Sequence, residues 1–108
     1  MISFKDFKKM EMRVGTIEKA ERVLDSKKLI KMRVSFADEE RQVVAGLIGH
    51  YEPKDLEKKQ FVFVTNLEHA KLMGIESEAM ILAAVEGKEE KVILIKPEKE
   101  ISNGTLIE

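Results

Sequence analysis

The sequence predicts an all-β fold of the small-barrel type. Three observations lead to this prediction: the chain contains several short segments with strand-like patterns, turn signals separate them, and no pattern alternates strands with long helices. A glycine inside the first strand pattern, Gly15, points the same way, because strands that coil around a small barrel bend at bulges and glycines.

The N-terminal elements are a short helix and a long strand. Residues 3–8 predict one or two helical turns, with Ser3 as the N-cap. Residues 12–24 alternate imperfectly between apolar and polar side chains and predict a strand. We expect a bulge or a sharp bend in this strand at Gly15.

The middle of the chain predicts two strands and a helix. Residues 29–36 alternate cleanly, and the side chains expected to face inward are Ile30, Met32, Val34 and Phe36. After an acidic turn, residues 41–46 predict the next strand. Pro53 begins a short helix that runs to Leu56, since proline is tolerated in a first helical turn.

Further strands are expected over residues 61–66, 79–85 and 91–97, with a short last piece after a turn at Asn103–Gly104. The segment 66–80 fits neither a strand nor a helix, and we expect an irregular loop there. Five or six strands, with a helix between the third and fourth, favour a five-stranded OB-fold barrel with short helices and N- and C-terminal extensions over an SH3-like barrel or a sandwich. No linker or repeat interrupts residues 1–108, which predicts one domain.

Composition narrows the class of protein. Apolar residues make up 44% of the 108 residues, charged residues 36%, and there is no cysteine. The missing cysteine excludes a disulfide scaffold, a thiolate zinc site and a cysteine nucleophile. No stretch approaches the roughly 18 apolar residues of a membrane span. We therefore expect a cytoplasmic protein without a membrane partner.

No catalytic or metal-binding motif stands out. The two histidines, His50 and His69, lie in different loops, and neither has a second histidine or a cysteine at metal-ligand spacing. The chain also lacks a glycine-rich phosphate loop and a serine in a nucleophile elbow. These absences predict a non-catalytic binding module with no cofactor and no metal.

Positive charge is concentrated at the start of the chain. Residues 1–35 hold ten Lys and Arg against five Asp and Glu, whereas residues 36–108 hold nine against fifteen. In OB folds, ligands bind strands 2 and 3 and the loops after strands 1 and 4. The cations expected on that surface are Lys27, Lys28, Lys31, Arg33 and Arg41. Basic side chains there suit the phosphates of a nucleic acid.

Segment 66–80 would follow the fourth strand and border the same surface. We expect its polar residues, Asn66, Lys71 and Ser77, to point outward and hydrogen-bond RNA. Hydrogen bonds of Asn66 and Ser77 to the loop's own backbone are the alternative, because both residue types make such bonds readily. Its apolar residues would anchor it to the core; these are Leu67, Leu72, Met73 and Ile75. The chain has no tryptophan and a single tyrosine, Tyr51. Because single-strand binders stack bases on aromatic rings, this composition predicts recognition of shape and backbone.

The order of these blocks resembles the tRNA-binding domain family. The blocks are MRVGTIEKAERV, SKKLIKMRV, RQVVAGLIGHYEP, FVFVTNL and KLMGIESEAMILAA. The most specific part is a signature carried by Asn66, Leu67, Lys71, Gly74, Ser77 and Met80. This family includes the C-terminus of methionyl-tRNA synthetases, stand-alone tRNA-binding proteins, synthetase-associated cofactors and a related bacterial secretion chaperone.

The resemblance implies an OB-fold homodimer that binds tRNA through its folded shape. It implies subunit pairing through Phe4, Phe7 and residues 101–107. The RNA-facing residues that it implies are Arg13, Lys28, Arg41, Asn66, Lys71 and Ser77, with Gly15, Gly46 and Gly74 setting the shape.

The chain departs from the family pattern at several positions. Ala79 stands where the family has glycine, His69 where proline is common, and Lys27 where an acidic residue is usual. Ala79 is expected to loosen the segment, because glycine reaches backbone conformations that alanine avoids.

Three functions follow from these observations. The first is a tRNA-binding β subunit or accessory domain that delivers tRNA to a methionyl-tRNA synthetase catalytic subunit. The second is a dimeric secretion-type chaperone that binds unfolded polypeptide. The third is a protein scaffold that binds a synthetase without RNA.

Overall fold

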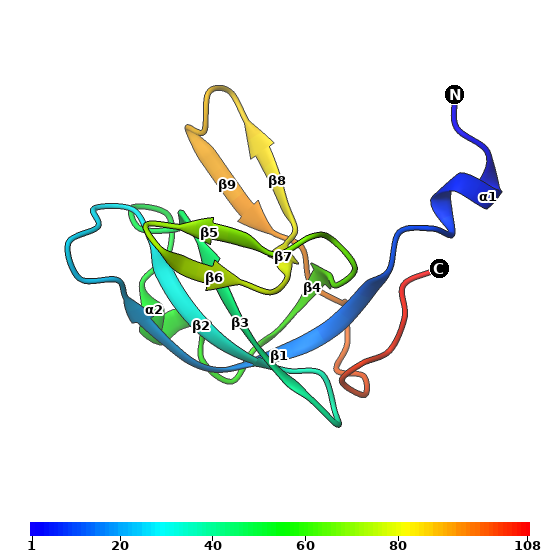
Figure 1. The fold of residues 1–108 in the computed structure, drawn as a ribbon, viewed down its shortest axis with the longest axis horizontal. Helices are drawn as coiled ribbons and strands as arrows, with labels where there is room; N and C mark the ends of the chain where they lie inside the picture. The colour runs from blue at the N-terminus through cyan, green and yellow to red at the C-terminus, as the bar shows by residue number, and fades with distance from the viewer.

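A five-stranded antiparallel sheet curls into a nearly closed barrel in the computed structural model, which describes residues 1–108 (Figure 1). The strand order is β3-β2-β1-β4-β7. These strands are β1 (Met12–Arg22), β2 (Ile30–Ser35), β3 (Glu40–Ala45), β4 (Gln60–Val64) and β7 (Met80–Ile81). The predicted all-β, OB-like barrel is confirmed.

Strand β1 bends around the barrel and pairs with β4 along its first half and with β2 along its second. The register shifts between Ile17 and Lys19, so the predicted irregularity lies at Glu18 and the expectation of a bulge at Gly15 is wrong. Gly15 pairs regularly with Phe61. A Cβ there would lie 2.7 Å from the side chains of Phe36 and Val34, so the glycine provides space for packing.

The barrel core follows the predicted alternation of β2. Its inward side chains are buried, namely Ile30, Met32, Val34 and, just beyond the strand, Phe36. Phe36 packs edge-on against Phe63 of β4, with ring centroids 5.4 Å apart. Helix α2 (Pro53–Leu56) starts at the predicted proline and inserts Leu56, which is fully buried, into the core.

The segment expected to be an irregular loop contains a β-hairpin. Strands β5 (Ala70–Leu72) and β6 (Ile75–Ser77) pair in register around a two-residue turn. Both turn residues have left-handed backbones, with φ of 51° at Met73 and 79° at Gly74. Positive φ at both positions is typical of a type I′ turn, which usually carries Asn-Gly. Met73-Gly74 lacks the asparagine or aspartate that usually marks such a turn, so the hairpin was not predicted from the sequence.

The hairpin closes the barrel against β3. The Glu78 amide donates to the Gln42 carbonyl at 2.8 Å. Two side chains then accept from β3 amides: Ser77 Oγ from Val44 at 2.9 Å and Glu78 Oε1 from Gln42 at 2.8 Å. Side-chain oxygens therefore substitute for part of the missing strand-to-strand ladder.

A second hairpin and two extensions surround the barrel (Figure 1). The single strand expected over residues 79–85 is divided, because the chain leaves the barrel at Leu82 and enters β8 (Ala83–Glu86), which pairs with β9 (Lys91–Leu94). Helix α1 (Phe4–Phe7) has the predicted Ser3 N-cap. The C-terminal segment runs beside β1, where the Gly104 amide donates to the Val14 carbonyl at 2.7 Å. Neither helix has the length and apolar character required to cross a bilayer.

Candidate nucleic-acid interface

The outward face of β1, β2 and β3 carries two rows of side chains. Pairing registers place Lys19, Arg33 and Gln42 in one row across the three strands. The neighbouring row is Glu21, Lys31 and Val44. These rows border a shallow depression of about 180 Å³. Lys31 and Arg33 thus lie on the outward side of β2, as expected.

Carboxylates partly neutralise the cations of this face. Lys31 Nζ lies 3.3 Å from a carboxylate oxygen of Glu21, and Arg33 Nε lies 2.7 Å from one of Glu40. Lys19 is exposed and has no carboxylate within ion-pair distance. Sequence reasoning missed Lys19 because the irregularity at Glu18 shifts the phase of alternation in β1.

The loop before β2 presents Lys27 and Lys28 to solvent. Its backbone is fixed from two sides: Ser26 Oγ accepts from the Lys28 amide at 3.2 Å, and the Lys28 carbonyl accepts from the Ile48 amide at 3.0 Å. The Lys28 ammonium is therefore a cation without a carboxylate partner, on a backbone held by hydrogen bonds just before the start of β2.

Lys71 is exposed on β5, directly opposite Glu76 of β6. The two side chains share one face of the hairpin, since opposed residues of an antiparallel pair point the same way. Glu76 reduces the positive potential around Lys71, whereas Lys28 has no carboxylate within ion-pair distance.

Arg41 lies on the inward side of the sheet and does not join the cationic rows. It pairs with the buried Val34, and only 23% of its side chain is exposed. Its guanidinium donates to the carbonyls of Thr65 at 2.6 Å and Glu78 at 3.1 Å. The alternation of β3 decides this orientation, and Arg41 ties two segments together at one end of the barrel.

Arg13 and Asn66 make comparable ties to the extensions. Arg13 donates to Glu11 at 2.9 Å and to the Gly104 carbonyl at 2.7 Å. The Asn66 amide group accepts from the Glu11 backbone at 2.8 Å and donates to the Lys9 carbonyl at 2.7 Å. Both side chains are therefore occupied with holding the termini against the barrel.

The Glu11 carboxylate is at the centre of this network. Its hydrogen bond from Arg13 lowers its pKa below the ordinary glutamate value of 4.5, and a second hydrogen bond from Thr65 Oγ1 acts in the same direction. The charged form of Glu11 therefore stabilises the junction of the N-terminal segment with the barrel.

The expectation that Ser77 points outward is wrong. Its side chain is buried and accepts from Val44 while donating to the Ala79 carbonyl at 3.0 Å. The anchoring residues also differ from expectation: Leu67 and Met73 are exposed, and only Leu72 and Ile75 are half-buried. Hairpin alternation explains Leu72, Ile75 and Ser77, which share one face of the hairpin, whereas Leu67 precedes the hairpin and Met73 lies in its turn.

Comparison with known proteins identifies the family. A family model described as "Putative tRNA binding domain" matches residues 12–106. The chain belongs to this family.

Several relatives of this tRNA-binding domain are methionine–tRNA ligases. The enzyme of Archaeoglobus fulgidus is 48% identical over 106 residues, which cover 98% of this chain, and that of Methanococcus aeolicus is 49% identical over 107 residues. The domain spans only 16% of the length of either enzyme.

Solved structures extend the relationship. A methionyl-tRNA synthetase-related protein from Pyrococcus horikoshii aligns with a TM-score of 0.92 and 38% identity, covering 99% of this chain and 97% of the other. The chaperone CsaA from Bacillus anthracis aligns with a TM-score of 0.90 and 31% identity, covering 100% and 99%. One domain architecture is therefore shared by synthetase-related and chaperone proteins.

The outward face of the tRNA-binding domain offers no aromatic platform. Phe36, Phe61 and Phe63 are buried in the barrel. Tyr51 is half-buried near β9, where its hydroxyl accepts from the Leu94 amide at 3.1 Å. With cations and no stacking rings, the face is chemically equipped to contact phosphates.

Proposed function

We propose that residues 1–108 are one non-catalytic unit that binds tRNA by its shape and serves in the cytoplasm as a β subunit or accessory domain of a methionyl-tRNA synthetase. The domain would raise the local tRNA concentration at its catalytic partner. The observation that carries this proposal is the row of outward cations on β1 and β2 in a chain of the tRNA-binding family.

The proposed phosphate contacts are the exposed or half-exposed cations around this face. They are Lys19, Lys28, Lys31, Arg33 and Lys71. Arg13, Arg41 and Asn66 would act indirectly, because their hydrogen bonds hold the barrel end and the termini in position. Ser77 is buried and has no place in the contact surface.

The first test is fluorescence anisotropy with labelled bulk tRNA across a salt series. Phosphate contacts release counterions, so affinity should fall steeply as salt rises. Duplex RNA and unstructured single-stranded RNA serve as competitors, and both should compete poorly if tertiary shape is recognised. Absence of binding at low salt would refute the proposal.

Charge reversal tests the face itself. Lys19→Glu and Arg33→Glu should each weaken tRNA binding by about tenfold and reduce the salt slope by about one, as expected for a lost phosphate contact. Lys88→Glu, in the turn between β8 and β9, makes the same change in net charge at an exposed position away from the face. Equal losses of tRNA affinity in all three variants would show that binding depends on net charge, and would count against this face as the binding surface.

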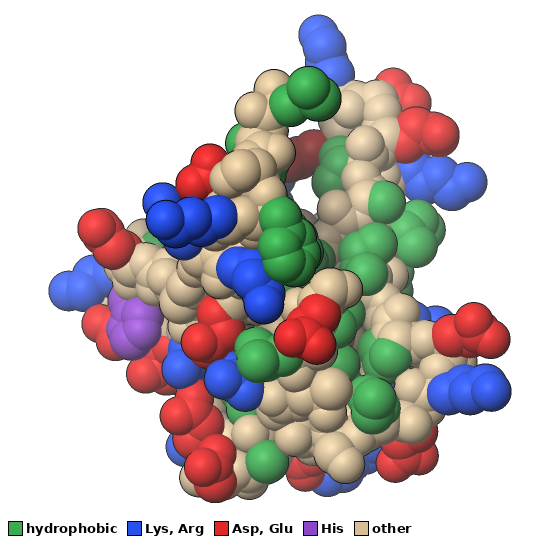
Figure 2. Space-filling model, turned by 90° about the vertical axis from the view of Figure 1, so that its right-hand side faces the viewer, with side chains coloured by type: hydrophobic (Ala, Val, Ile, Leu, Met, Phe, Trp, Pro, Cys, Tyr) green, Lys and Arg blue, Asp and Glu red, His purple; other side chains and the backbone are tan.

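We also propose that the domain forms a homodimer through its N- and C-terminal segments. Phe4 is 70% exposed and borders, with Phe7, Met10, Leu106 and Ile107, a groove of about 380 Å³. Figure 2 faces this side of the molecule and presents several hydrophobic side chains around a hollow. Large exposed apolar patches are characteristic of interaction surfaces, and a second copy would cover this one.

The same apolar groove supports a second candidate function. A dimeric chaperone of the CsaA type, to which the chain is structurally similar, would bind unfolded polypeptide in the part of this groove that the dimer interface leaves open. Such binding should be insensitive to salt, because apolar contact drives it. Suppression of the aggregation of a denatured client protein at high salt, with no affinity for tRNA, would favour this function over the first.

A further inference from the structure

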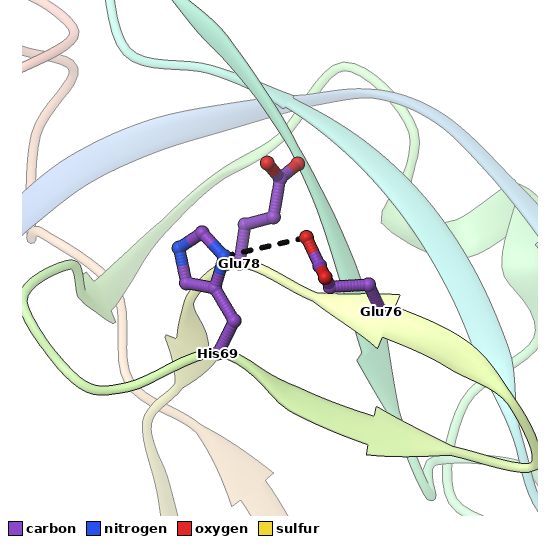
Figure 3. Close-up of side chains that lie close together, drawn as sticks. All are labelled: His69, Glu76 and Glu78. Atoms are coloured by element: carbon purple, nitrogen blue, oxygen red, sulfur yellow. Dashed lines mark hydrogen bonds and ion pairs between the residues drawn. The ribbon is translucent and has the colours of Figure 1, made fainter.

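The β5–β6 hairpin brings together three side chains that are separate in sequence. Ala70 pairs with Ser77. The same register places the preceding residue, His69, opposite Glu78 at the open end of the hairpin. Glu76 lies in β6, and Glu78 follows one residue after the end of that strand, so the extended backbone directs both side chains to the same face. Figure 3 shows the three side chains beside one another, with His69 and Glu76 facing each other and the Glu78 carboxylate turned away from that pair.

Their distances suit a shared metal ion. His69 Nδ1 lies 3.4 Å from Glu76 Oε2, and one ligand atom from each of the three residues lies within 4.8 Å of the others. Zinc–nitrogen and zinc–oxygen bonds of about 2.1 Å in a tetrahedron separate neighbouring ligand atoms by about 3.4 Å. The His–Glu76 pair already has this spacing, and a carboxylate oxygen of Glu78 lies within 4.8 Å of both ligand atoms.

The backbone beneath the cluster is fixed by Gln42. The backbone amide of Gln42 donates to Glu78 Oε1 at 2.8 Å, which leaves Oε2 of Glu78 free. The side chain of Gln42 donates to the Glu76 carbonyl at 2.8 Å. Hydrogen bonds of this kind orient carboxylate ligands and reduce the entropy lost on metal binding.

The cluster is also accessible and chemically selective. The side chains of His69 and Glu76 are 47% and 51% exposed, so an ion can enter from solvent. An imidazole ligand favours ions such as Zn²⁺ over Mg²⁺ and Ca²⁺, which prefer oxygen ligands throughout. Lys71 shares this face opposite Glu76, without an ion pair between them, and is the cation that opposes metal entry.

We propose that His69, Glu76 and Glu78 form a binding site for Zn²⁺ or a similar divalent transition-metal ion, with water completing the coordination. The ion links both strands of the hairpin at its open end. Through Glu78, it also reinforces the contact of the hairpin with β3. The site is structural, and it neutralises two carboxylates beside Lys71.

The test is Zn²⁺ binding to the chelator-treated, nucleic-acid-free protein, measured by competition with a chromogenic chelator and by the rise in thermal midpoint with metal concentration. We expect saturable one-to-one binding that His69→Ala and Glu78→Gln each weaken by about tenfold or more. His50→Ala, which removes the other histidine, should stay within about twofold of the wild type. Mg²⁺ should not raise the thermal midpoint.

Several results would overturn the proposal: no saturable Zn²⁺ binding, binding unchanged in His69→Ala, or an equal loss in His50→Ala. Thermal midpoints without metal establish that each variant is folded, as expected for an exposed histidine. Glu76→Gln provides a second carboxylate variant that leaves the Gln42–Glu78 hydrogen bond intact and should also weaken binding.

Discussion

Individual side chains close this barrel where the backbone does not. Ser77 Oγ accepts from the Val44 amide, and Glu78 Oε1 accepts from that of Gln42. Both amides belong to the edge strand β3, which has no full-length strand beside it on that side. Buried backbone donors need partners, and these two oxygens provide them.

Replacing Ser77 with alanine should lower the free energy of unfolding by about 1–3 kcal/mol, because the buried Val44 amide loses its acceptor. Urea denaturation measures this change. Ser102→Ala, at an exposed serine without a side-chain hydrogen bond, should be neutral. If Ser77→Ala keeps full stability yet loses tRNA affinity, our structural assignment for Ser77 is wrong.

The Glu11 network predicts a pH-dependent contribution to stability. Arg13 and Thr65 hold the pKa of Glu11 below 4.5 in the folded protein, so its contribution is present above the unfolded value and is lost as pH falls through the folded one. Glu11→Gln should therefore be less stable than the wild type at pH 7, with a difference that shrinks at about pH 3. Urea midpoints at both pH values test this, with Glu98→Gln as an exposed control. A difference independent of pH would contradict it.

The carboxylates beside the cationic rows should restrain RNA binding. Glu40 occupies Arg33 in the free protein, and phosphate must displace it. Glu40→Gln should tighten tRNA binding a few-fold at low salt, consistent with the roughly 0.2–1 kcal/mol of an exposed ion pair. Glu86→Gln, on β8, removes the same charge away from the face and should have less effect. Anisotropy titrations of the two variants show whether the change in tRNA affinity comes from the Arg33–Glu40 ion pair or from net charge.

At the scale of elements, the β5–β6 hairpin determines how the barrel closes. Its turn residues, Met73 and Gly74, both have positive φ, and Met73 is 61% exposed. An L-residue in the left-handed region costs about 1–2 kcal/mol, and asparagine tolerates this region better than most residues. The hairpin therefore folds despite an unfavourable turn residue.

Met73→Asn should raise the free energy of unfolding by up to about 1 kcal/mol, because Asn-Gly suits a type I′ turn and the exposed methionine contributes little packing. Thermal or urea denaturation measures the gain. Met80→Asn, at an exposed methionine within β7, is the matched control and should not stabilise. A destabilised Met73→Asn protein would indicate that Met73 makes contacts in solution beyond those of this chain.

At the scale of the whole molecule, the two termini lie on one side of the barrel (Figure 1). Hydrogen bonds from Arg13 and Asn66 hold the extensions there, and α1 contains no buried residue. A helix with one exposed and one half-buried phenylalanine contributes little to the stability of a single chain, which suits a role in subunit pairing.

Phe4→Ser should convert the proposed dimer to monomers at micromolar concentration, as measured by sedimentation velocity. Leu24→Ser, at a leucine that is 87% exposed in the loop after β1, removes a comparable apolar surface elsewhere and should leave the dimer intact. A wild-type protein that sediments as a monomer would exclude the dimer. A Phe4→Ser variant that remains dimeric would place the interface on another surface.

Local patterns in the sequence were sufficient for most of the barrel. The alternation in β2, Pro53 at the start of α2 and the Ser3 cap depend on neighbouring residues alone, and the structure has all three. The order of sequence blocks likewise identified the family. The orientation of Lys31 and Arg33 followed because the pattern in their strand is regular.

Pairing between distant segments decided the orientation of the other polar side chains. The irregularity at Glu18 brought Lys19 into the row with Arg33, whereas the registers of β3 and β6 turned Arg41 and Ser77 inward. The Met73–Gly74 turn brought His69 beside two glutamates that lie seven and nine residues further along the chain. The sequence therefore determined most of the barrel strands and the family to which the chain belongs. Only the tertiary structure decided which polar side chains outside β2 reach solvent, because that depends on strand register and barrel closure, which local alternation does not encode.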